Sequence, residues 1–296
     1  MCVHGNAVRK EKVMENETLQ RMMAFANNLP EKEMSQSLPD GIDCPLCGGN
    51  GYVMVQDVYG YEVAKPCQCL SQRILNSRIR YCGLPESVKD IALKTFSLSV
   101  YQEPESKAVA SAACQAIKYY LDNFEQMKAT GKGLYLYSGT KGSGKTRMAA
   151  SIANELMRNH DTSVRFATSI TILDEIKNSW NAKEYTERQL LDSLFTVPVL
   201  IIDDFGAERA TEWAGDRFYQ IINERYINNR VTIFTSNMSL NSLKYDDRIT
   251  NRIKERNFCV DFPEESVREH IAEKNRREMA GSIRNEKKSE RTGMVL

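Results

Sequence analysis

The sequence predicts an α/β protein, with a parallel sheet that carries helices on both faces, preceded by a small module held together by a metal ion. Two observations lead to this prediction. Short apolar segments alternate with longer amphipathic ones between residues 105 and 280, which is typical of repeated strand–helix units. Four of the eight cysteines lie between residues 44 and 69, where their spacing is typical of a structural metal site.

The composition is that of a soluble chain with a hydrophobic core. Its 296 residues are 42% hydrophobic and 27% charged, which allows one large domain and a smaller one. The apolar run at 197–202 is too short to cross a bilayer, and residues 1–16 show no signal-peptide pattern. We therefore expect a cytoplasmic protein with no membrane partner. The net charge of +1 neither indicates nor excludes a nucleic acid partner.

Five regions follow one another along the chain. One helix is predicted at 10–28, and a basic helix at 70–81 ends where Gly83-Leu84-Pro85 breaks the pattern. The predicted boundaries are 1–40 for an N-terminal helical segment, 41–72 for a cysteine-rich zinc-binding module, 73–104 for a linker helix and connector, 105–280 for the α/β domain and 281–296 for a basic tail. This polar tail is expected to be disordered.

The cysteine-rich module consists of a C-x₂-C pair and a C-x-C pair. Its four cysteines are Cys44, Cys47, Cys67 and Cys69. The segments 52–55 and 59–63 are predicted strands of a hairpin that turns near 57–60 and returns the second pair to the first. Four thiolates brought together in this way match a tetrahedral, structural zinc site. Four reduced cysteines in a loop are the alternative, but so small a module needs a cross-link to fold.

A glycine-rich loop begins the α/β domain's site. A predicted strand at 134–137 leads into Gly-Thr-Lys-Gly-Ser-Gly-Lys-Thr, and a helix follows at 147–158. Strand, loop and helix in this order are the context in which G-x-x-x-x-G-K-T binds ATP or GTP. Backbone N–H groups and Lys145 bind the phosphates, and the Thr146 hydroxyl ligates Mg²⁺. The predicted nucleotide-binding residues of the loop are Gly139, Thr140, Lys141, Gly142, Ser143, Gly144, Lys145 and Thr146.

Alternating elements continue to residue 280. The predicted helices lie at 106–128, 170–180, 184–194, 214–228 and 264–280, and the further strands at 163–167, 197–203, 232–235 and 258–261. This alternation is what predicts a parallel sheet with helices on both faces.

Polar side chains stand at the ends of two of these strands. Asp203 and Asp204 follow one apolar strand, and Asn237 follows the next. Because ligands bind at the carboxyl edge of open α/β sheets, these side chains are expected beside the phosphate loop. Asp203 would bind Mg²⁺ with Thr146, and Asp204 would activate or orient the attacking water. Asn237 would contact the γ-phosphate or that water. Since aspartate is shorter than glutamate, slow turnover is expected from Asp204.

Three arginines near the C-terminus are candidates for contact with the phosphates. Arg248 and Arg252 lie one helical turn apart, and either can act as an arginine finger on a neighbouring subunit's γ-phosphate. Arg268 follows the start of the last predicted helix, where it can reach the phosphates of its own subunit.

Together these residues resemble the AAA+ ATPases of the DnaC/DnaI helicase-loader family, with the IstB transposition ATPases as close relatives. The resemblance runs from about Arg78 to Arg277. It is carried by Lys-Gly-Leu-Tyr-Leu-Tyr at 132–137, the phosphate loop (Walker A), Val-Leu-Ile-Ile-Asp-Asp-Phe-Gly-Ala-Glu at 199–208, Thr-Ser-Asn at 235–237 and Ser-Val-Arg at 266–268. It implies that Asn237 is sensor 1, Arg252 the arginine finger and Arg268 sensor 2. Phe205 departs from the pattern, because an aliphatic residue is usual there.

The resemblance implies an ATPase that loads a replicative, DnaB-type helicase onto single-stranded DNA during replication initiation. The cysteine module is similar to the helicase-binding domain of DnaI-type loaders. The ATPase domains would form a homo-oligomer around ATP, with slow hydrolysis stimulated by assembly or DNA. The implied cofactors are ATP, Mg²⁺ and Zn²⁺. Single-stranded DNA contacts are expected near Thr168, Ser169 and Lys177.

Three other functions are alternatives to helicase loading. An IstB-like transposition helper would act on duplex DNA and a transposase, but such a chain needs no cysteine module. A non-hydrolysing adaptor switched by ATP stays open because Asp204 stands at the water-activating position. An origin initiator of the DnaA type would need a DNA-binding domain after the last helix, where only residues 281–296 follow.

Overall fold

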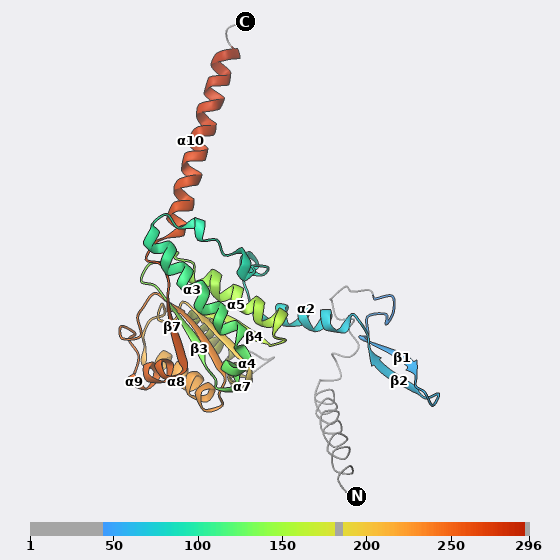
Figure 1. The fold of residues 1–296 in the computed structure, drawn as a ribbon. Coiled ribbons are helices and arrows are strands. Elements are labelled where there is room, and N and C mark those ends of the chain that lie inside the picture. Colours follow the sequence, from blue (N-terminus) through green and yellow to red (C-terminus); the bar gives the residue numbers. More distant parts are fainter. Residues whose placement is uncertain (1–43, 181–185, 294–296) are drawn as a thin grey trace, which may run out of the picture. The chain divides into compact units, whose positions relative to one another are not determined.

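A computed structural model of the chain describes residues 44–180 and 186–293, with side chains placed up to residue 280 (Figure 1). The predicted helix at 10–28 lies outside the described residues. The chain divides into two compact units, and the boundary follows Arg73.

The small unit contains a two-stranded antiparallel sheet. Strand β1 (Tyr52–Gln56) pairs with β2 (Glu62–Pro66) along their whole lengths. The predicted second strand, 59–63, began three residues too early. The turn is longer than the sequence indicated, because the Asp57 carboxylate accepts the N–H groups of Tyr59 and Tyr61 at 2.8 and 2.9 Å.

A helix and a series of short turns lead into the large unit. Helix α2 (Leu70–Cys82) ends at Gly83, whose φ of 82° is readily adopted only by glycine. The 3₁₀ helices η2 (Glu86–Val88), η3 (Leu93–Thr95) and η4 (Leu98–Val100) form the connector to the first long helix of the large unit.

The large unit is built on a five-stranded sheet whose strand pairs are all parallel. Its strands are β3 (Gly133–Tyr137), β4 (Val164–Thr168), β5 (Val199–Asp203), β6 (Val231–Ser236) and β7 (Asn257–Asp261). Their order across the sheet is β4-β5-β6-β3-β7, so β3 lies between β6 and β7. This sheet confirms the predicted fold class.

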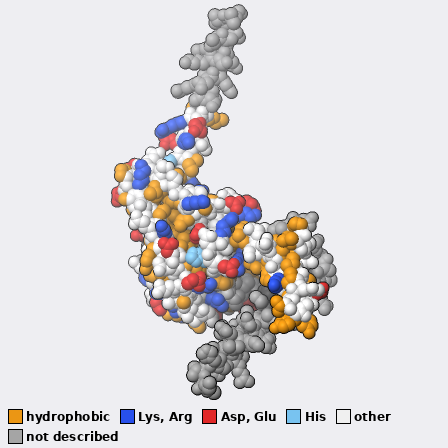
Figure 2. Space-filling view, turned by 45° about the vertical axis from the view of Figure 1, so that its right-hand side comes forward, with side chains coloured by type: hydrophobic (Ala, Val, Ile, Leu, Met, Phe, Trp, Pro, Cys, Tyr) orange, Lys and Arg blue, Asp and Glu red, His pale blue; other side chains and the backbone are white. Residues whose placement is uncertain are grey.

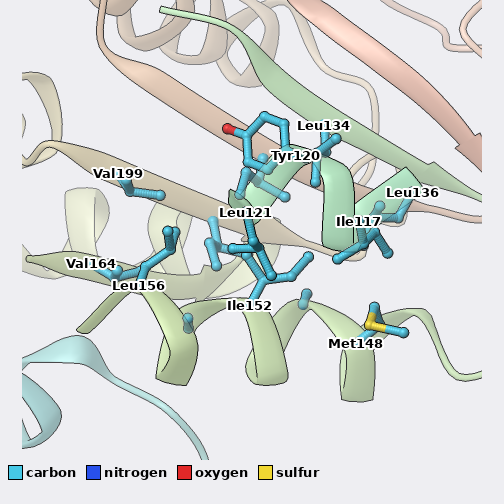
Figure 3. Close-up of a cluster of buried hydrophobic side chains, with 14 of the residues drawn as sticks. Ile117, Tyr120, Leu121, Leu134, Leu136, Met148, Ile152, Leu156, Val164 and Val199 are labelled. Atoms are coloured by element: carbon cyan, nitrogen blue, oxygen red, sulfur yellow. The ribbon is translucent and has the colours of Figure 1, made fainter. Parts of the chain in front are cut away.

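Helices cover both faces of the sheet (Figure 1). They are α3 (Pro104–Asp122), α4 (Phe124–Ala129), α5 (Lys145–Asn159), α6 (Ser169–Ser179), α7 (Glu187–Thr196), α8 (Glu212–Ile227) and α9 (Asp247–Arg256). Side chains alternate between the faces, so Val199 and Ile201 pack against α3 and α5 while Leu200 and Ile202 pack toward α6 to α9. Figure 3 shows part of the first cluster, where Ile117 and Leu121 of α3 meet Ile152 of α5.

Packing on the sheet face that is covered by α6 to α9 explains why phenylalanine stands at position 205. The Phe205 side chain is buried, with ring centroids 5.2 Å from Phe218, 5.0 Å from Phe234 and 5.2 Å from Tyr245. This aromatic cluster fills a volume that an aliphatic side chain would leave partly empty.

Two predicted helices differ from the observed ones. The helix predicted at 106–128 is two helices, because the chain leaves helical geometry at Asn123. The last helix, α10 (Val267–Gly293), begins three residues later than predicted, since Glu264 and Glu265 are engaged elsewhere and Ser266 Oγ accepts the N–H of Glu269.

Helix α10 also corrects the prediction for the tail. Residues 281–293 were expected to be disordered, but their backbone continues α10 to Gly293. Their sequence is rich in Arg, Glu and Lys and lacks proline, so helix propensity is favourable after Gly281. Among the described residues, no helix combines the length and apolar character needed to span a membrane.

Candidate nucleotide-binding site and cysteine cluster

A cavity of about 430 Å³ opens at the carboxyl edge of the sheet, beside the phosphate loop. Six of the eight predicted loop residues line it, together with three of the predicted catalytic residues; these are Lys141, Gly142, Ser143, Gly144, Lys145, Thr146, Asp204, Asn237 and Arg268. The structure therefore brings together residues from the loop after β3, the start of α5, the ends of β5 and β6, and α10 that the sequence analysis assigned to one site.

Two glycines of the loop are required by its shape. Gly142 and Gly144 have φ of 82° and 101°, values that side-chain-bearing residues rarely adopt. A Cβ on Gly142 would lie 2.9 Å from Ser266 Oγ, and one on Gly144 would lie 3.0 Å from Tyr101 Oη. The loop thus fits tightly between α10 and the connector, with its N–H groups at the start of α5.

Lys145 is held inside the loop. Its Nζ donates to the carbonyl oxygens of Ser138 and Thr140, each at 3.0 Å, and to Ser143 Oγ at 3.1 Å. Burial lowers the pKa of Lys145, and the nearby carboxylates of Asp204 and Glu264 oppose that effect. The ammonium group is therefore placed among oxygen acceptors that a phosphate can replace.

Asp203 lies at the end of β5 and bridges two elements. Its Oδ1 accepts from Thr146 Oγ1 at 3.0 Å and from Thr235 Oγ1 at 2.5 Å. Burial raises the pKa of Asp203, while these hydroxyl donors favour its ionised form. Asp203 and Thr146 together present the oxygen ligands that Mg²⁺ prefers.

Thr235 is a site residue that sequence reasoning missed as a functional group. Besides its bond to Asp203, its Oγ1 accepts the backbone N–H of Asp204 at 2.9 Å. The hydroxyl fixes both acidic residues relative to β6. Its sequence signal was its place in Thr-Ser-Asn at 235–237, where the resemblance gave a role to Asn237 alone.

Asp204 takes an uncommon backbone conformation at the cavity wall. Its φ is 53°, in the left-handed region where aspartate is tolerated but not preferred. Ser169 Oγ donates to the Asp204 carbonyl oxygen at 3.0 Å, and Thr235 holds the N–H. These two bonds keep the Asp204 side chain at the cavity, where Asn237 lies on the neighbouring strand end.

The first two loop residues lie outside the cavity lining. The Glu264 carboxylate accepts from Gly139 N and Thr140 Oγ1, both at 2.7 Å, which ties the loop to the segment before α10. Arg268, in the first turn of α10, is exposed and lines the cavity. Glu264 was not predicted to take part, because a lone glutamate before a helix has no distinguishing pattern.

The other end of the cavity is largely apolar and comes from the connector. Its lining residues include Phe96, Val100 and Tyr101, together with Val267 and Ile271 of α10. Tyr101 Oη donates to the Ser143 carbonyl at 2.7 Å, so the connector is anchored on the loop itself. A surface of this kind suits a flat heteroaromatic base, and only the apolar residues interspersed with polar ones at 93–101 could have indicated it.

The predicted arginine fingers lie elsewhere. Arg248 and Arg252 are on α9 and are absent from the cavity's lining residues. The three residues predicted to contact DNA have local partners: Thr168 caps α6, Ser169 binds Asp204, and Lys177 lies over the Trp213 ring at 5.1 Å.

The four cysteines of the small unit form one cluster. The Sγ atoms of Cys44, Cys47, Cys67 and Cys69 all lie within 4.8 Å of one another. Those of Cys44 and Cys67 are 3.7 Å apart, and those of Cys47 and Cys69 are 3.4 Å apart. Tetrahedral Zn–S bonds of about 2.3 Å separate the sulfur atoms by about 3.8 Å, so the cluster fits zinc.

The backbone around the first cysteine pair, Cys44 and Cys47, favours thiolates. Burial opposes ionisation of Cys47, but the N–H of Gly51 and the neighbouring thiols lower its pKa to about 6. The Gly51 N–H lies 3.3 Å from Cys47 Sγ, and the Gly51 carbonyl accepts the N–H of Cys67 at 2.9 Å. The two halves of the cluster are therefore joined through the start of β1.

Comparison with known proteins gives the site a family context. The family model described as IstB-like ATP binding protein matches residues 72–269. The "Replicative helicase loader DnaI" of Bacillus subtilis is 28% identical over 257 residues, covering 80% of each chain. The "Phage-like element PBSX protein XkdC" of the same organism is 27% identical over 226 residues, covering 74% of this chain and 80% of XkdC.

Solved structures agree with these matches. The crystal structure of DnaI has a TM-score of 0.50 and 28% identity, covering 60% of this chain and 94% of that one. A putative primosome component from Streptococcus pyogenes has a TM-score of 0.51 and 26% identity, covering 64% and 96%. The structure of the DnaC helicase loader, at 24% identity and a TM-score of 0.52, shares the fold.

Proposed function

Because the chain belongs to the family of IstB-like ATP binding proteins, we propose that it is an ATP-dependent loader of a replicative, DnaB-type helicase onto single-stranded DNA. One observation supports this most strongly. The similarity to the helicase loader DnaI covers 80% of this chain, whereas residues 74–296 make up about three quarters of it. The similarity therefore extends into the unit that carries the cysteines.

The large unit would bind and hydrolyse ATP. The phosphates would lie along the loop and Lys145, with the base against Phe96 and Tyr101. Thr146 and Asp203 would hold Mg²⁺, which would neutralise charge on the phosphates. Asp204 would orient the attacking water, and Asn237 would contact that water or the γ-phosphate. Since a single aspartate at this position is short, turnover would be slow until subunits assemble.

The small unit would bind zinc through its four cysteines and contact the helicase through its apolar surface. Figure 2 shows hydrophobic side chains gathered on this unit. They include Val58, Tyr59 and Tyr61, which are 92%, 82% and 71% exposed. Exposed apolar side chains grouped in so small a unit are typical of a protein-binding surface. Such a chain would work in the cytoplasm, beside its helicase and DNA.

Helicase loading onto a covalently closed circle of single-stranded DNA tests this proposal. A ring-shaped helicase cannot thread onto a circle, so its stable retention requires a loader. We expect retention only with both this chain and ATP. Lys145→Ala should lower retention at least tenfold, whereas the matched change Lys118→Ala, at an exposed position on α3, should leave it unchanged.

The two alternative functions, transposition helper and ATP-switched adaptor, predict other results. Equal retention without the chain would contradict the loader function. Binding of duplex DNA and a transposase in place of the helicase would establish the IstB-like function. Full loading with a non-hydrolysable ATP analogue, and no phosphate release at any protein concentration, would establish an adaptor switched by ATP binding.

A further inference from the structure

Tyrosine and arginine side chains alternate between helices α8 and α9. The Arg248 guanidinium carbon lies 4.8 Å from the centre of the Tyr219 ring, and that of Arg252 lies 5.0 Å from the same ring. Arg252 is also 5.6 Å from the centre of the Tyr226 ring, and Arg256 is 4.5 Å from it. Arg252 is therefore the middle arginine, in contact with both rings.

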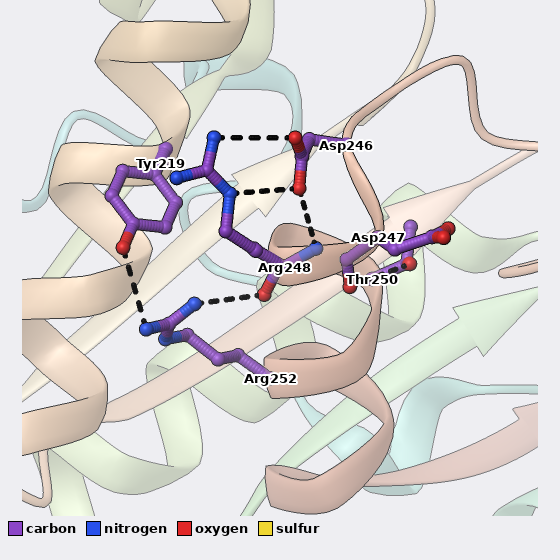
Figure 4. Close-up of polar contacts among 6 residues, drawn as sticks. All are labelled: Tyr219, Asp246, Asp247, Arg248, Thr250 and Arg252. Carbon is purple, nitrogen blue, oxygen red and sulfur yellow. Dashed lines mark hydrogen bonds and ion pairs between the residues drawn. The ribbon is translucent and has the colours of Figure 1, made fainter.

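The outer two arginines, Arg248 and Arg256, are both engaged by other groups. Arg248 pairs with a carboxylate, and Arg256 donates a hydrogen bond to a distant part of the backbone. Arg248 forms two hydrogen bonds to the Asp246 carboxylate, with Nε at 3.0 Å and a terminal nitrogen at 3.2 Å (Figure 4). Arg256 donates to the carbonyl oxygen of Thr130 at 2.6 Å, which ties α9 to the turn before β3. Arg248 is thus neutralised by a carboxylate, and Arg256 holds two elements together.

Among the described residues, Arg252 differs from Arg248 in having no carboxylate partner, and from Arg256 in that its backbone acceptor lies on its own helix. Within the described part of the chain it forms no ion pair with a carboxylate; one terminal nitrogen donates to the Arg248 carbonyl at 3.0 Å. The other lies 3.4 Å from Tyr219 Oη, and its Nε, like that of Arg256, is buried without a hydrogen-bond partner. Figure 4 shows the Arg252 guanidinium at the hydroxyl end of Tyr219, joined to Oη by a dashed line. Its positive charge is held in place without being neutralised.

We infer that Tyr219 is a positioning residue that presents Arg252 to the γ-phosphate of ATP bound by a second copy of this chain. The inference rests on the proposed ATPase function. A ring holds a guanidinium by cation–π attraction and leaves its charge available, whereas a carboxylate would compete with the phosphate for it. An arginine directed at a transferring phosphate requires this combination of fixed position and free charge.

The arrangement also distinguishes the two candidate fingers. Before Arg248 could reach a phosphate it would have to give up two hydrogen bonds to Asp246. Arg252 would give up only a bond to a backbone carbonyl and a long contact to a hydroxyl. The structure therefore favours Arg252 as the group that acts between subunits.

Substitutions at Tyr219 test this inference through ATP turnover at protein concentrations that allow assembly. Tyr219→Leu removes the ring and should lower the stimulated turnover at least tenfold, as should Arg252→Ala. Tyr219→Phe keeps the ring and loses only the long hydroxyl contact, so it should remain within twofold of wild type. Arg248→Ala and the control Tyr119→Leu, at an exposed tyrosine of α3, should also remain within twofold.

A mixing experiment separates positioning from a general loss of structure. Tyr219→Leu subunits keep an intact phosphate loop, and Lys145→Ala subunits keep an intact Tyr219 and Arg252. An equimolar mixture should turn over ATP at least threefold faster than the sum of the two variants assayed separately. The affinity of the Tyr219→Leu variant for a fluorescent ATP analogue and its unfolding temperature should match those of the wild type.

Three outcomes would overturn the inference. They are wild-type turnover in Tyr219→Leu, equal losses of turnover in the Tyr219→Leu and Tyr219→Phe variants, and no gain in turnover on mixing. A wild-type chain that neither hydrolyses ATP nor assembles with it would also overturn it, together with the hydrolytic part of the proposed function. Helicase binding is measured in a separate experiment. A chain that hydrolyses ATP through Arg252 but does not bind the helicase would therefore contradict the loader function and leave this inference intact.

Discussion

The small and large units are held together by different means. Among residues 44–73, the buried hydrophobic side chains are the cysteines Cys44, Cys47 and Cys67, while large apolar side chains such as Tyr59 are exposed. The large unit instead buries two extended hydrophobic clusters, one on each face of its sheet. Its functional side chains are polar and stand at the sheet edge.

This difference means that the two units depend on different interactions for their stability. A module of about 30 residues cannot bury enough apolar area to be stable alone. A metal ion bound by the four cysteines would take the place of a core, and would leave the apolar side chains free for the proposed partner. The large unit needs no such cross-link, and can keep a strained aspartate and a buried lysine in its site.

Removal of zinc should have the largest effect and should act on one unit only. Metal binding by four thiolates contributes on the order of 10 kcal/mol to folding of such modules. Chelation, or Cys67→Ser, should therefore make residues 44–73 sensitive to protease and leave the unfolding transition of the large unit unchanged. Cys259→Ser, at an exposed cysteine on β7, is the matched control. Equal protease resistance after chelation, with no bound metal detected, would exclude the zinc site.

Substitution of a buried arginine should destabilise the large unit only. The Arg225 guanidinium donates to the carbonyl oxygens of Leu194, Val197 and Val231 at 2.6, 2.9 and 2.5 Å. Burial lowers the pKa of Arg225 to about 9, so it stays charged at neutral pH.

Arg225→Met would leave those carbonyls without donors, and should lower the free energy of unfolding by about 3 kcal/mol. Arg230→Met, at an exposed neighbour, should change it by less than about 0.5 kcal/mol. Denaturant titration of the full chain measures both. A loss below 1 kcal/mol in the first variant would show that the buried charge costs as much as its hydrogen bonds contribute.

Changes on the surface of the small unit should affect binding without affecting folding. Tyr59→Ser combined with Tyr61→Ser should weaken the complex with the helicase at least tenfold, because exposed aromatic side chains are frequent hot spots. Zinc content and the ATP affinity of the large unit should be unchanged. Tyr119→Ser is the control, and titration calorimetry is the measurement. An unchanged affinity would place the helicase contact elsewhere.

The smallest effect concerns pH. Glu265 is buried, and its carboxylate accepts the N–H groups of Gln102 and Glu103 at 2.6 and 3.3 Å, at the start of α3. Burial opposes its ionisation, but these donors lower the pKa of Glu265 overall. A lowered pKa stabilises the fold above the ordinary glutamate pKa of about 4.3, and this contribution is lost as pH falls through the folded-state value.

Glu265→Gln should therefore cost about 1 kcal/mol at pH 7, and the difference from wild type should shrink as pH falls below about 4.3 and disappear below the folded-state pKa of Glu265. Thermal unfolding across this range measures it, with Glu269→Gln, at an exposed position in the first turn of α10, as the control. A difference that grows at low pH would contradict the assigned direction.

Sequence patterns predicted most of the sheet and the acidic end of β5. They succeeded where neighbouring residues in the sequence determine the structure. In the loop from Gly139 to Thr146, for example, backbone angles and close contacts require Gly142 and Gly144. The cysteine cluster was likewise predicted from spacing, because a hairpin between the two cysteine pairs returns the second pair to the first.

The missed residues owe their roles to tertiary packing. Thr235 and Glu264 bind groups 32 and 125 positions away in the sequence, and no local pattern assigned a role to either side chain. Phe96 and Tyr101 reach the cavity only because the connector folds onto the loop. The break at Asn123 and the late start of α10 depend on neighbouring hydrogen bonds, which no helical periodicity encodes.

The mass of the complexes formed with the source organism's replicative helicase, with and without ATP, tests the account most directly. We predict that the wild-type chain forms a stable complex, that ATP increases the number of its copies bound, and that Cys67→Ser abolishes binding while Cys259→Ser does not. No complex under either condition, or equal binding by the Cys67→Ser variant, would contradict the assignment of helicase binding to the small unit.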